Sequence, residues 1–302
     1  MLLDRAAGRF IVTSLFASLA ACAGGDVPES ALRQELEGGA RGVEAGALPR
    51  LDVDASAPPA AEAGAACAPG TQTFSTPGAY TFVVPDYLTL SVEVWGAGGA
   101  GEASGAQAPN ATAGGDSSFG AVIAGGGGAG TYGAGGKGGA ATGGLVNTPG
   151  GGGGPGVHYP VIGSLSSGGA APNGGKGGAG VNGVDPCGGG DGRSGDAPGG
   201  GGAPSWSCQG AWLQGYGWGD CGGSGGGGAY ASTDFKPGAL PATVPIVVGK
   251  GGAGSLGQVS SQVSGQGKNP GHYTGGDGAP GAVKVTWTCR PAPEPSEPNG
   301  PK

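Results

Sequence analysis

The sequence is poor in the large apolar side chains from which ordinary protein cores are built. Leu, Ile, Val and Phe together account for 46 of 302 residues, about 15%, which is below the usual lower limit for a globular chain. Charged residues are also scarce, at 12%, so charge repulsion does not explain the small core. These shortages exclude a conventional two-domain enzyme with thick helical layers, and they disfavour a highly charged disordered chain.

Basic clusters and histidines are nearly absent as well. The formal net charge is −7 and the pI is near 4.7, while Lys and Arg are scattered singly. Nucleic acid is therefore a poor candidate partner, because phosphate binding needs clustered Lys and Arg. His158 and His272 are the only histidines, and no pair of titratable residues is recognisably placed for acid–base chemistry. We therefore expect a protein that is not an enzyme and that uses no cofactor and no metal.

Glycine is what the chain has in excess. It contains 78 Gly and 25 Pro residues, about a third of its length, which signals an unusual architecture. Collagen is excluded because no strict Gly-X-Y period is present. Disordered linkers and a bundle of extended polyglycine-II chains, which can approach closely because glycine has no Cβ, remain in competition. The glycine-rich segments are residues 96–115, 124–156, 168–202 and 222–228.

Residues 1–22 have the features of an export signal. Two arginines precede an apolar run over residues 10–21, which is about the length of a signal-peptide core and too short to span a membrane. The run ends in LAAC, whose last residue is Cys22. This sequence looks like a bacterial lipobox, and a plain secretory signal with a chance cysteine is the alternative. We expect residues 1–21 to be removed as a lipoprotein signal peptide and Cys22 to be lipidated.

The residue after Cys22 indicates where the lipoprotein resides. It is Ala23 and not Asp, a pattern that in Gram-negative lipoproteins implies the outer membrane, facing either the periplasm or the cell surface. The membrane is then a partner through the lipid anchor on Cys22. We interpret residues 22–66 as a lipidated flexible tether and residues 290–302 as a Pro-rich disordered tail.

Between these parts, residues 67–289 are predicted to form one glycine-rich β domain. Residues 88–95 alternate, with Leu88, Leu90, Val92 and Val94 predicted to face inward. Pro245 is expected to place its strand at an edge or a bulge. The predicted fold class is mainly β: a small antiparallel β sandwich or partial barrel with packed polyglycine-II helices and almost no α-helix after the signal peptide. The predicted strands are residues 79–84, 88–95, 117–123, 229–235, 243–248 and 282–288.

The cysteines offer two disulfide candidates in an oxidising envelope. Cys67 precedes the first predicted strand and Cys289 follows the last, so a bridge between them would join the two ends of the domain. Cys208 and Cys221 are the closest pair along the chain, which leaves Cys187 without a partner.

A Cys-bounded insert, residues 187–221, contains an unusual concentration of aromatic residues. Three of the five tryptophans of the chain fall within it. These aromatics either pack on a thin core or form an exposed platform for sugar rings or a protein partner. The candidate ligand-binding residues are Trp206, Trp212, Tyr216 and Trp218.

Four segments combine strand ends with glycine runs in a recognisable order: TFVVPDYLTLSVEVWGAGGAG (81–101), GGGGAYAS (225–232), IVVGKGGAG (246–254) and GAVKVTW (281–287). These segments resemble a family of glycine-rich domains found in bacterial surface proteins, in phage tail-fibre and adhesin proteins, and in anaplastic lymphoma kinase-type receptors. The resemblance implies polyglycine-II helices packed beside a β framework, and binding of ligands or receptors without catalysis. It therefore favours polyglycine II over disordered linkers.

Two functional hypotheses follow. The first is a non-enzymatic outer-membrane or cell-surface lipoprotein that displays the glycine-rich domain for adhesion to a glycan or a surface protein. The second is a structural envelope or matrix spacer without a specific ligand. Exposure of the tryptophans in the insert distinguishes the two hypotheses.

Overall fold

The computed structural model describes residues 67–103, 111–131, 133–156, 166–180, 191–209, 218–257 and 273–289, and for residues 206–209 and 218–221 it describes the backbone alone. Within these ranges the chain is all β, with no α-helix. The lipidation candidate Cys22, the predicted tether and tail, and Trp212, Tyr216 and Cys187 of the insert lie outside the described residues. The strands are β1 (Gly70–Phe74), β2 (Gly78–Val83), β3 (Tyr87–Trp95), β4 (Ser117–Phe119), β5 (Val122–Ala124), β6 (Ala141–Thr142), β7 (Val146–Thr148), β8 (Trp206–Gln209), β9 (Trp218–Cys221), β10 (Tyr230–Phe235), β11 (Thr243–Val248), β12 (Leu256–Gly257), β13 (Tyr273–Thr274) and β14 (Ala282–Cys289).

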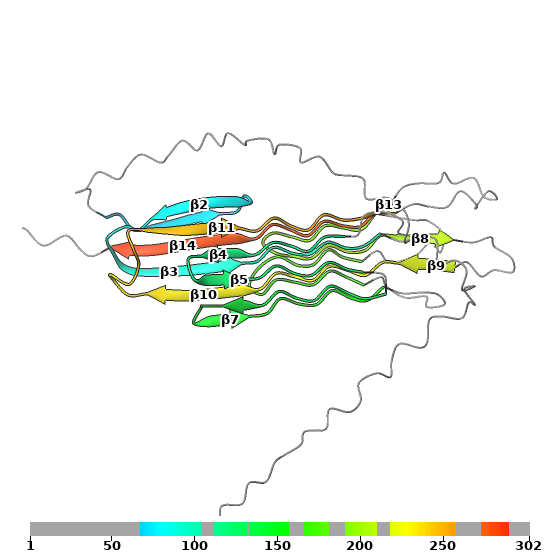
Figure 1. Ribbon diagram of the computed structural model, residues 1–302, viewed down its shortest axis with the longest axis horizontal. Helices are drawn as coiled ribbons and strands as arrows, with labels where there is room; N and C mark the ends of the chain where they lie inside the picture. Colours follow the sequence, from blue (N-terminus) through cyan, green and yellow to red (C-terminus); the bar gives the residue numbers. More distant parts are fainter. Residues whose placement is uncertain are drawn as a thin grey trace, which may run out of the picture. The chain divides into compact units, whose positions relative to one another are not determined.

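Two five-stranded antiparallel sheets pack face to face and confirm the predicted sandwich (Figure 1). One sheet has the strand order β1-β14-β3-β10-β7, and the other has the order β2-β11-β4-β5-β6. β3 is central in the first sheet because it pairs with β14 over residues 87–95 and with β10 over residues 90–95. The two remaining sheets are the short pairs β8-β9 and β12-β13.

The apolar residues that the sequence does contain are concentrated between the two sheets. Because side chains alternate along a strand, one face of each sheet buries a continuous set of apolar groups, each worth about 1.5–3 kcal/mol for a large aliphatic or aromatic side chain. Phe82 contacts both Phe119 and Trp287, with ring centroids 5.8 Å apart in each pair. The fully buried aliphatic residues of this core are Leu90, Val92, Val94, Ile246, Val283 and Val285.

Leu88 does not face the core as the alternation predicted. Its side chain is 43% exposed, whereas that of Tyr87 is buried. The register explains the difference, because Thr288 pairs with Thr89 and Cys289 pairs with Tyr87, so the pairing shifts past Leu88. This irregularity turns Tyr87 inward, where its hydroxyl donates a hydrogen bond of 2.6 Å to the carbonyl oxygen of Lys236.

Two further strand predictions were wrong. Residues 117–123 form no single strand, because β4 and β5 make a hairpin that turns at Gly120, whose φ of 57° favours glycine. Pro245 does not place β11 at an edge, because β11 lies between β2 and β4. The carbonyl of Pro245 accepts a hydrogen bond from the N–H of Gly120, which lies just after the last residue of β4. The position where an N–H would stand on Pro245 faces the same way, so the proline removes no hydrogen bond from the β4–β11 ladder.

Beyond the sandwich, the glycine-rich segments form a bundle of extended chains that hydrogen-bond sideways to one another (Figure 1). In residues 96–102, the N–H groups donate in a repeating order to the segments 222–229, 111–116 and 275–281, with N···O distances of 2.8–3.1 Å. A repeat of three residues with no bonds inside the segment is the geometry of a polyglycine-II helix. The polyglycine-II packing expected from the sequence is therefore present.

Three central segments, residues 96–103, 199–205 and 222–229, are each hydrogen-bonded to six neighbours, as in hexagonal packing. Glycine is required there, because a Cβ at Gly98 or Gly225 would lie within 3 Å of the backbone of an adjacent segment. Nine outer segments surround the central ones among the described residues: 111–116, 125–130, 135–140, 149–156, 166–171, 175–180, 191–196, 249–255 and 275–281.

Outer segments carry their larger side chains at every third residue, on the side that faces solvent. Lys137 and Ala140 are exposed, and so are Lys250 and Ala253, while the glycines between them are buried or half-buried. In these two outer segments the lysine side chains thus lie where no neighbouring segment is present. The sequence pattern Gly-Gly-X in these segments is the direct consequence of a helix with three residues per turn.

Candidate ligand-binding end of the glycine bundle

Successive segments of the bundle run in opposite directions, so the chain reverses alternately at one end of the bundle and at the other. At the end joined to the sandwich, segments connect through the β4–β5 and β6–β7 hairpins and through the short turns at 172–174 and 197–199. We call the opposite end the distal end. The described residues on either side of six undescribed stretches lie there: 103 and 111, 131 and 133, 156 and 166, 180 and 191, 209 and 218, and 257 and 273.

The β8–β9 pair stands on the middle of the distal end. β8 follows the central segment 199–205 directly, and β9 leads directly into the central segment 222–229. Figure 1 shows β8 and β9 continuing past the bundle on the side away from the sandwich. The structure therefore places β8 and β9, the described strands of the tryptophan-rich part of the insert, at the extremity of the described domain, where the hydrogen-bonded central segments hold both of them.

The sequence-predicted ligand residues divide between the described and the undescribed parts of this insert. Trp206 lies in β8 opposite Cys221, and Trp218 lies in β9 opposite Gln209. Cys208 pairs in register with Gly219, and the Cys208–Cys221 disulfide stays a prediction. Trp212 and Tyr216, which fall between the two strands, are outside the described residues, so their part in a binding surface also stays a prediction.

Glu102 is the one buried acidic residue among the described side chains, and sequence reasoning passed over it. It lies at the distal end of the central segment 96–103 and is 4% exposed. Within the described part of the chain, its Oε2 atom is buried without a hydrogen-bond partner. Desolvation by burial raises the pKa of this carboxyl above its ordinary value. The available signal in the sequence was that Glu102 is the only charged residue in this segment.

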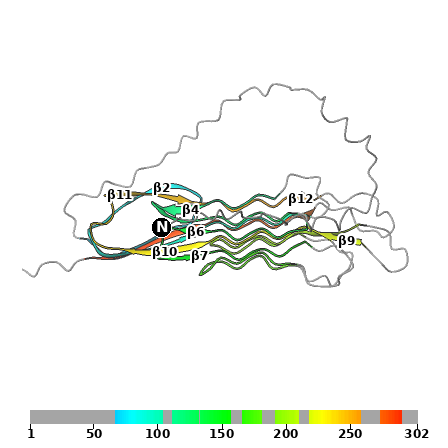
Figure 2. The ribbon, with the colours of Figure 1, turned by 60° about the horizontal axis from the view of Figure 1, so that its bottom comes forward.

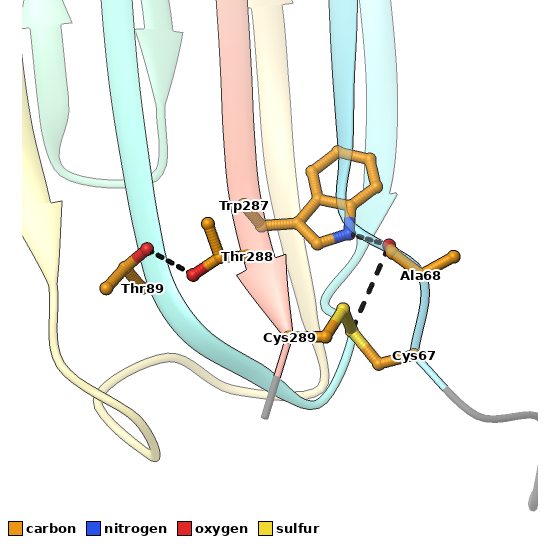
Figure 3. Close-up of a disulfide and its surroundings, with 6 residues drawn as sticks. All are labelled: Cys67, Ala68, Thr89, Trp287, Thr288 and Cys289. Atoms are coloured by element: carbon orange, nitrogen blue, oxygen red, sulfur yellow. Dashed lines mark hydrogen bonds between the residues drawn. A yellow bond between two sulfur atoms is a disulfide. The ribbon is translucent and has the colours of Figure 1, made fainter. Parts of the chain in front are cut away.

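The end of the sandwich opposite the bundle holds both ends of the described chain (Figure 3). A disulfide joins Cys67 to Cys289, with Cα atoms 5.6 Å apart, which confirms the predicted bridge. The indole N–H of Trp287 donates a 2.8 Å hydrogen bond to the carbonyl of Ala68, and its ring covers Gly70, where a Cβ would clash with it. The first and last described residues therefore lie at the end of the domain remote from β9, which Figure 2 shows on the far side of the glycine bundle from β10 and β11.

The remaining surface features of the described residues offer little chemistry. A shallow hollow of about 300 Å³ beside the disulfide end is lined mainly by Val84, Pro85 and Leu240, with Asp86 as its carboxylate. On the outer face of one sheet, Lys284 forms a 2.9 Å ion pair with Glu93, and this hydrogen bond raises the pKa of Lys284. No group of His, Cys, Asp and Glu side chains in the described ranges is arranged to hold a metal ion.

The described residues also contain no helix of the length and apolarity needed to cross a membrane. The chain matches no protein-family model, no curated protein and no solved structure. The resemblance to glycine-rich adhesin and receptor domains is thus a prediction from the sequence motifs.

Proposed function

We propose that this protein is a lipid-anchored outer-membrane lipoprotein that binds a ligand at the distal end of its glycine bundle. The observation that carries the proposal is the separation of the two ends of the domain. Both ends of the described chain meet at the Cys67–Cys289 disulfide, whereas the β8–β9 pair lies at the distal end. Since the predicted tether joins the domain at Cys67, a lipid anchor on Cys22 would attach the domain by its disulfide end and leave the distal end free to contact a ligand.

The bundle supports this proposal as a rigid stem. Lateral hydrogen bonds fix each central segment to six neighbours, and fully buried backbone groups that are paired in this way resist local opening. Binding residues are commonly carried by loops that a rigid scaffold positions. β8 and β9 have this relation to the central segments that they continue.

The aromatic residues of the insert indicate the chemical class of ligand. Trp and Tyr provide large contact areas that suit sugar rings and protein surfaces, and the net charge of −7 disfavours nucleic acid. We favour a glycan, with a surface protein as the second outcome of the test. A structural spacer without a ligand is the alternative function, supported by the same hydrogen-bonded bundle.

We expect saturable binding that depends on the insert. The test uses the chain from residue 22 carrying Cys22→Ser, so that it is not lipidated, applied to a glycan array and to envelope extracts. Replacing two tryptophans by alanine, in a Trp206→Ala/Trp218→Ala variant, should weaken binding about thirtyfold or more, because aromatic anchors dominate interface energies.

A matched control removes exposed apolar side chains from the sandwich. Val83 and Leu88 are 50% and 43% exposed, and a Val83→Ala/Leu88→Ala variant should bind as the unmodified chain does. Circular dichroism would verify that both variants fold. Equal loss in the two variants would reject the insert as the binding site, and the absence of binding by every variant would favour the spacer.

A further inference from the structure

Glu102 occupies the point at which both strands of the β8–β9 pair leave the bundle. Its N–H donates to the carbonyl of Gly223 at 2.9 Å, and its carbonyl accepts from the N–H of Ser205 at 3.2 Å. Ser205 immediately precedes β8, and Gly222 immediately follows β9. Gly222 packs so closely that an added Cβ would lie 2.8 Å from the Cβ of Glu102. The base of the pair is thus closed around this residue.

The environment of the carboxyl favours its neutral form. Glu102 is 4% exposed, and in the described structure its Oε2 accepts no hydrogen bond. The described parts of the adjoining segments 125–131, 199–205, 222–229 and 249–255 present one ionisable side chain, that of Lys250. Lys250 is exposed and lies five residues from Ser255, whose Oγ accepts from the N–H of Ala103 at 2.6 Å, so it is remote from this base.

As ionisable groups, the described parts of the two remaining adjoining segments contribute acidic side chains only. The segment 275–281 contributes Asp277, whose Oδ1 accepts from the N–H of Gly254 at 2.7 Å. The segment 111–116 contributes Asp116, whose Oδ1 accepts from the N–H of Gly126. A buried carboxylate without a cationic partner is costly, and the cost disappears if the carboxylate reaches water.

We propose that Glu102 is a pH-responsive latch beneath the β8–β9 pair, closed when its carboxyl is protonated and opened when the carboxyl ionises. Opening means that Ser205 and Gly222 separate from Glu102 and that water hydrates the carboxylate, while the sandwich and the rest of the bundle stay folded. The latch is independent of any ligand, so its test does not depend on the proposed binding function.

The direction of the pH effect follows from proton linkage. Burial raises the pKa of Glu102 in the closed state, so the closed state binds the proton more tightly than the open state does. The stabilisation of the closed state over the open state by this proton is therefore complete below the ordinary glutamate pKa. It is lost as the pH rises through the raised pKa. Between these two values the opening constant should increase by up to about tenfold per pH unit.

Hydrogen–deuterium exchange of the full mature chain at several values between about pH 4 and about pH 8 tests the latch, a range that begins near the ordinary glutamate pKa. After correction for the intrinsic exchange rate, protection of the amides in β8, β9 and Gly222 should fall with rising pH. A Glu102→Gln variant keeps the shape but cannot ionise, and its protection should stay constant. Glu93→Gln, which removes an exposed ion pair on the sandwich, is the matched control and should retain the fall.

Parallel protection profiles of the unmodified chain and the Glu102→Gln variant would overturn the proposal. A second measurement keeps it testable if that variant does not fold. Carbon-13 NMR of the side-chain carboxyls would give the pH of the titration midpoint of Glu102 in the unmodified chain. Protection of the amides should stop falling at the same pH. A fall in protection at any other pH would also reject the latch.

Discussion

A single methyl group added at Gly225 is expected to destabilise the glycine bundle strongly. We expect Gly225→Ala to lower the free energy of unfolding by about 3 kcal/mol or more, above the usual range for overpacking a core with side chains that can shift. Urea unfolding followed by tryptophan fluorescence and circular dichroism measures the change. The effect would be large for a substitution that is nearly neutral on most protein surfaces.

The physical reason is that every neighbour of Gly225 is backbone. An added Cβ would lie 2.7 Å from the carbonyl oxygen of Ala100 and nearer still to that of Gly99. The N–H of Gly225 is bonded to Gly202, and its carbonyl accepts from Gly169, each at 2.9 Å. Accommodating the methyl group requires a segment to move away, which breaks several buried hydrogen bonds whose groups have no alternative partner, at about 1–3 kcal/mol each.

Gly152 provides the matched control within the same bundle. It lies on the outer segment 149–156, is exposed, and the nearest atom to an added Cβ would be the carbonyl oxygen of Gly136 at 3.8 Å. Gly152→Ala should therefore leave stability unchanged or raise it by up to about 1 kcal/mol, because alanine restricts the unfolded chain. Equal stabilities of the Gly225→Ala and Gly152→Ala variants would contradict the close-packed arrangement of the central segments.

The strands of the sandwich were predictable where apolar and polar residues alternate along the sequence, and they were less predictable where this alternation is absent. β11 was predicted over its whole length, and β3 and β14 to within one residue, because their apolar residues alternate. β1 was missed, since its sequence GTQTF is mostly polar and mostly exposed. Leu88 was placed on the wrong side because alternation cannot anticipate a register shift, which depends on the partner strand.

The glycine segments were harder to interpret, because a residue without a side chain leaves no hydrophobic periodicity. Some outer segments differ from the central ones in what occupies every third position. In the outer segments Lys137 and Lys250 stand there and reach solvent, whereas the central segment 96–103 has Ala97 and Ala100, which are completely buried. Alanine at this position does not separate the two kinds of segment, because Ala140 and Ala253 of the outer segments are exposed.

The sequence identified which residues make up the candidate site, but it did not show where in the fold they lie. The tryptophan-rich insert was identified from the sequence, but the central segments that hold β8 and β9 at the distal end follow from bundle topology. Glu102 was overlooked for the same reason. One carboxylate in a glycine run is normally a solvated residue, and only the six-neighbour packing of its segment shows that it is buried.

Removing the disulfide is expected to produce the second large effect. Cys67 and Cys289 are 222 residues apart, and closing so long a loop restricts the unfolded chain by about 5 kcal/mol in the chain-entropy model, while removal of native bridges commonly costs 2–5 kcal/mol. The bridge also holds β1, an edge strand that pairs with β14 alone. A Cys67→Ser/Cys289→Ser variant should therefore unfold at a lower urea concentration, with early loss of the Trp287–Ala68 contact.

A Cys208→Ser/Cys221→Ser variant is the matched control, because it also removes two cysteines but from a short interval in the distal insert. Loop-closure entropy grows with the logarithm of loop length, so the control should lose less stability than the Cys67→Ser/Cys289→Ser variant. Exchange measurements would then separate the two mechanisms. A purely entropic bridge lowers protection equally throughout the domain, whereas a bridge that also holds β1 lowers it most at Thr71 and Thr73, which pair with Thr286 and Lys284. Unchanged stability of the first variant would mean that the β1–β14 ladder holds the edge without covalent help.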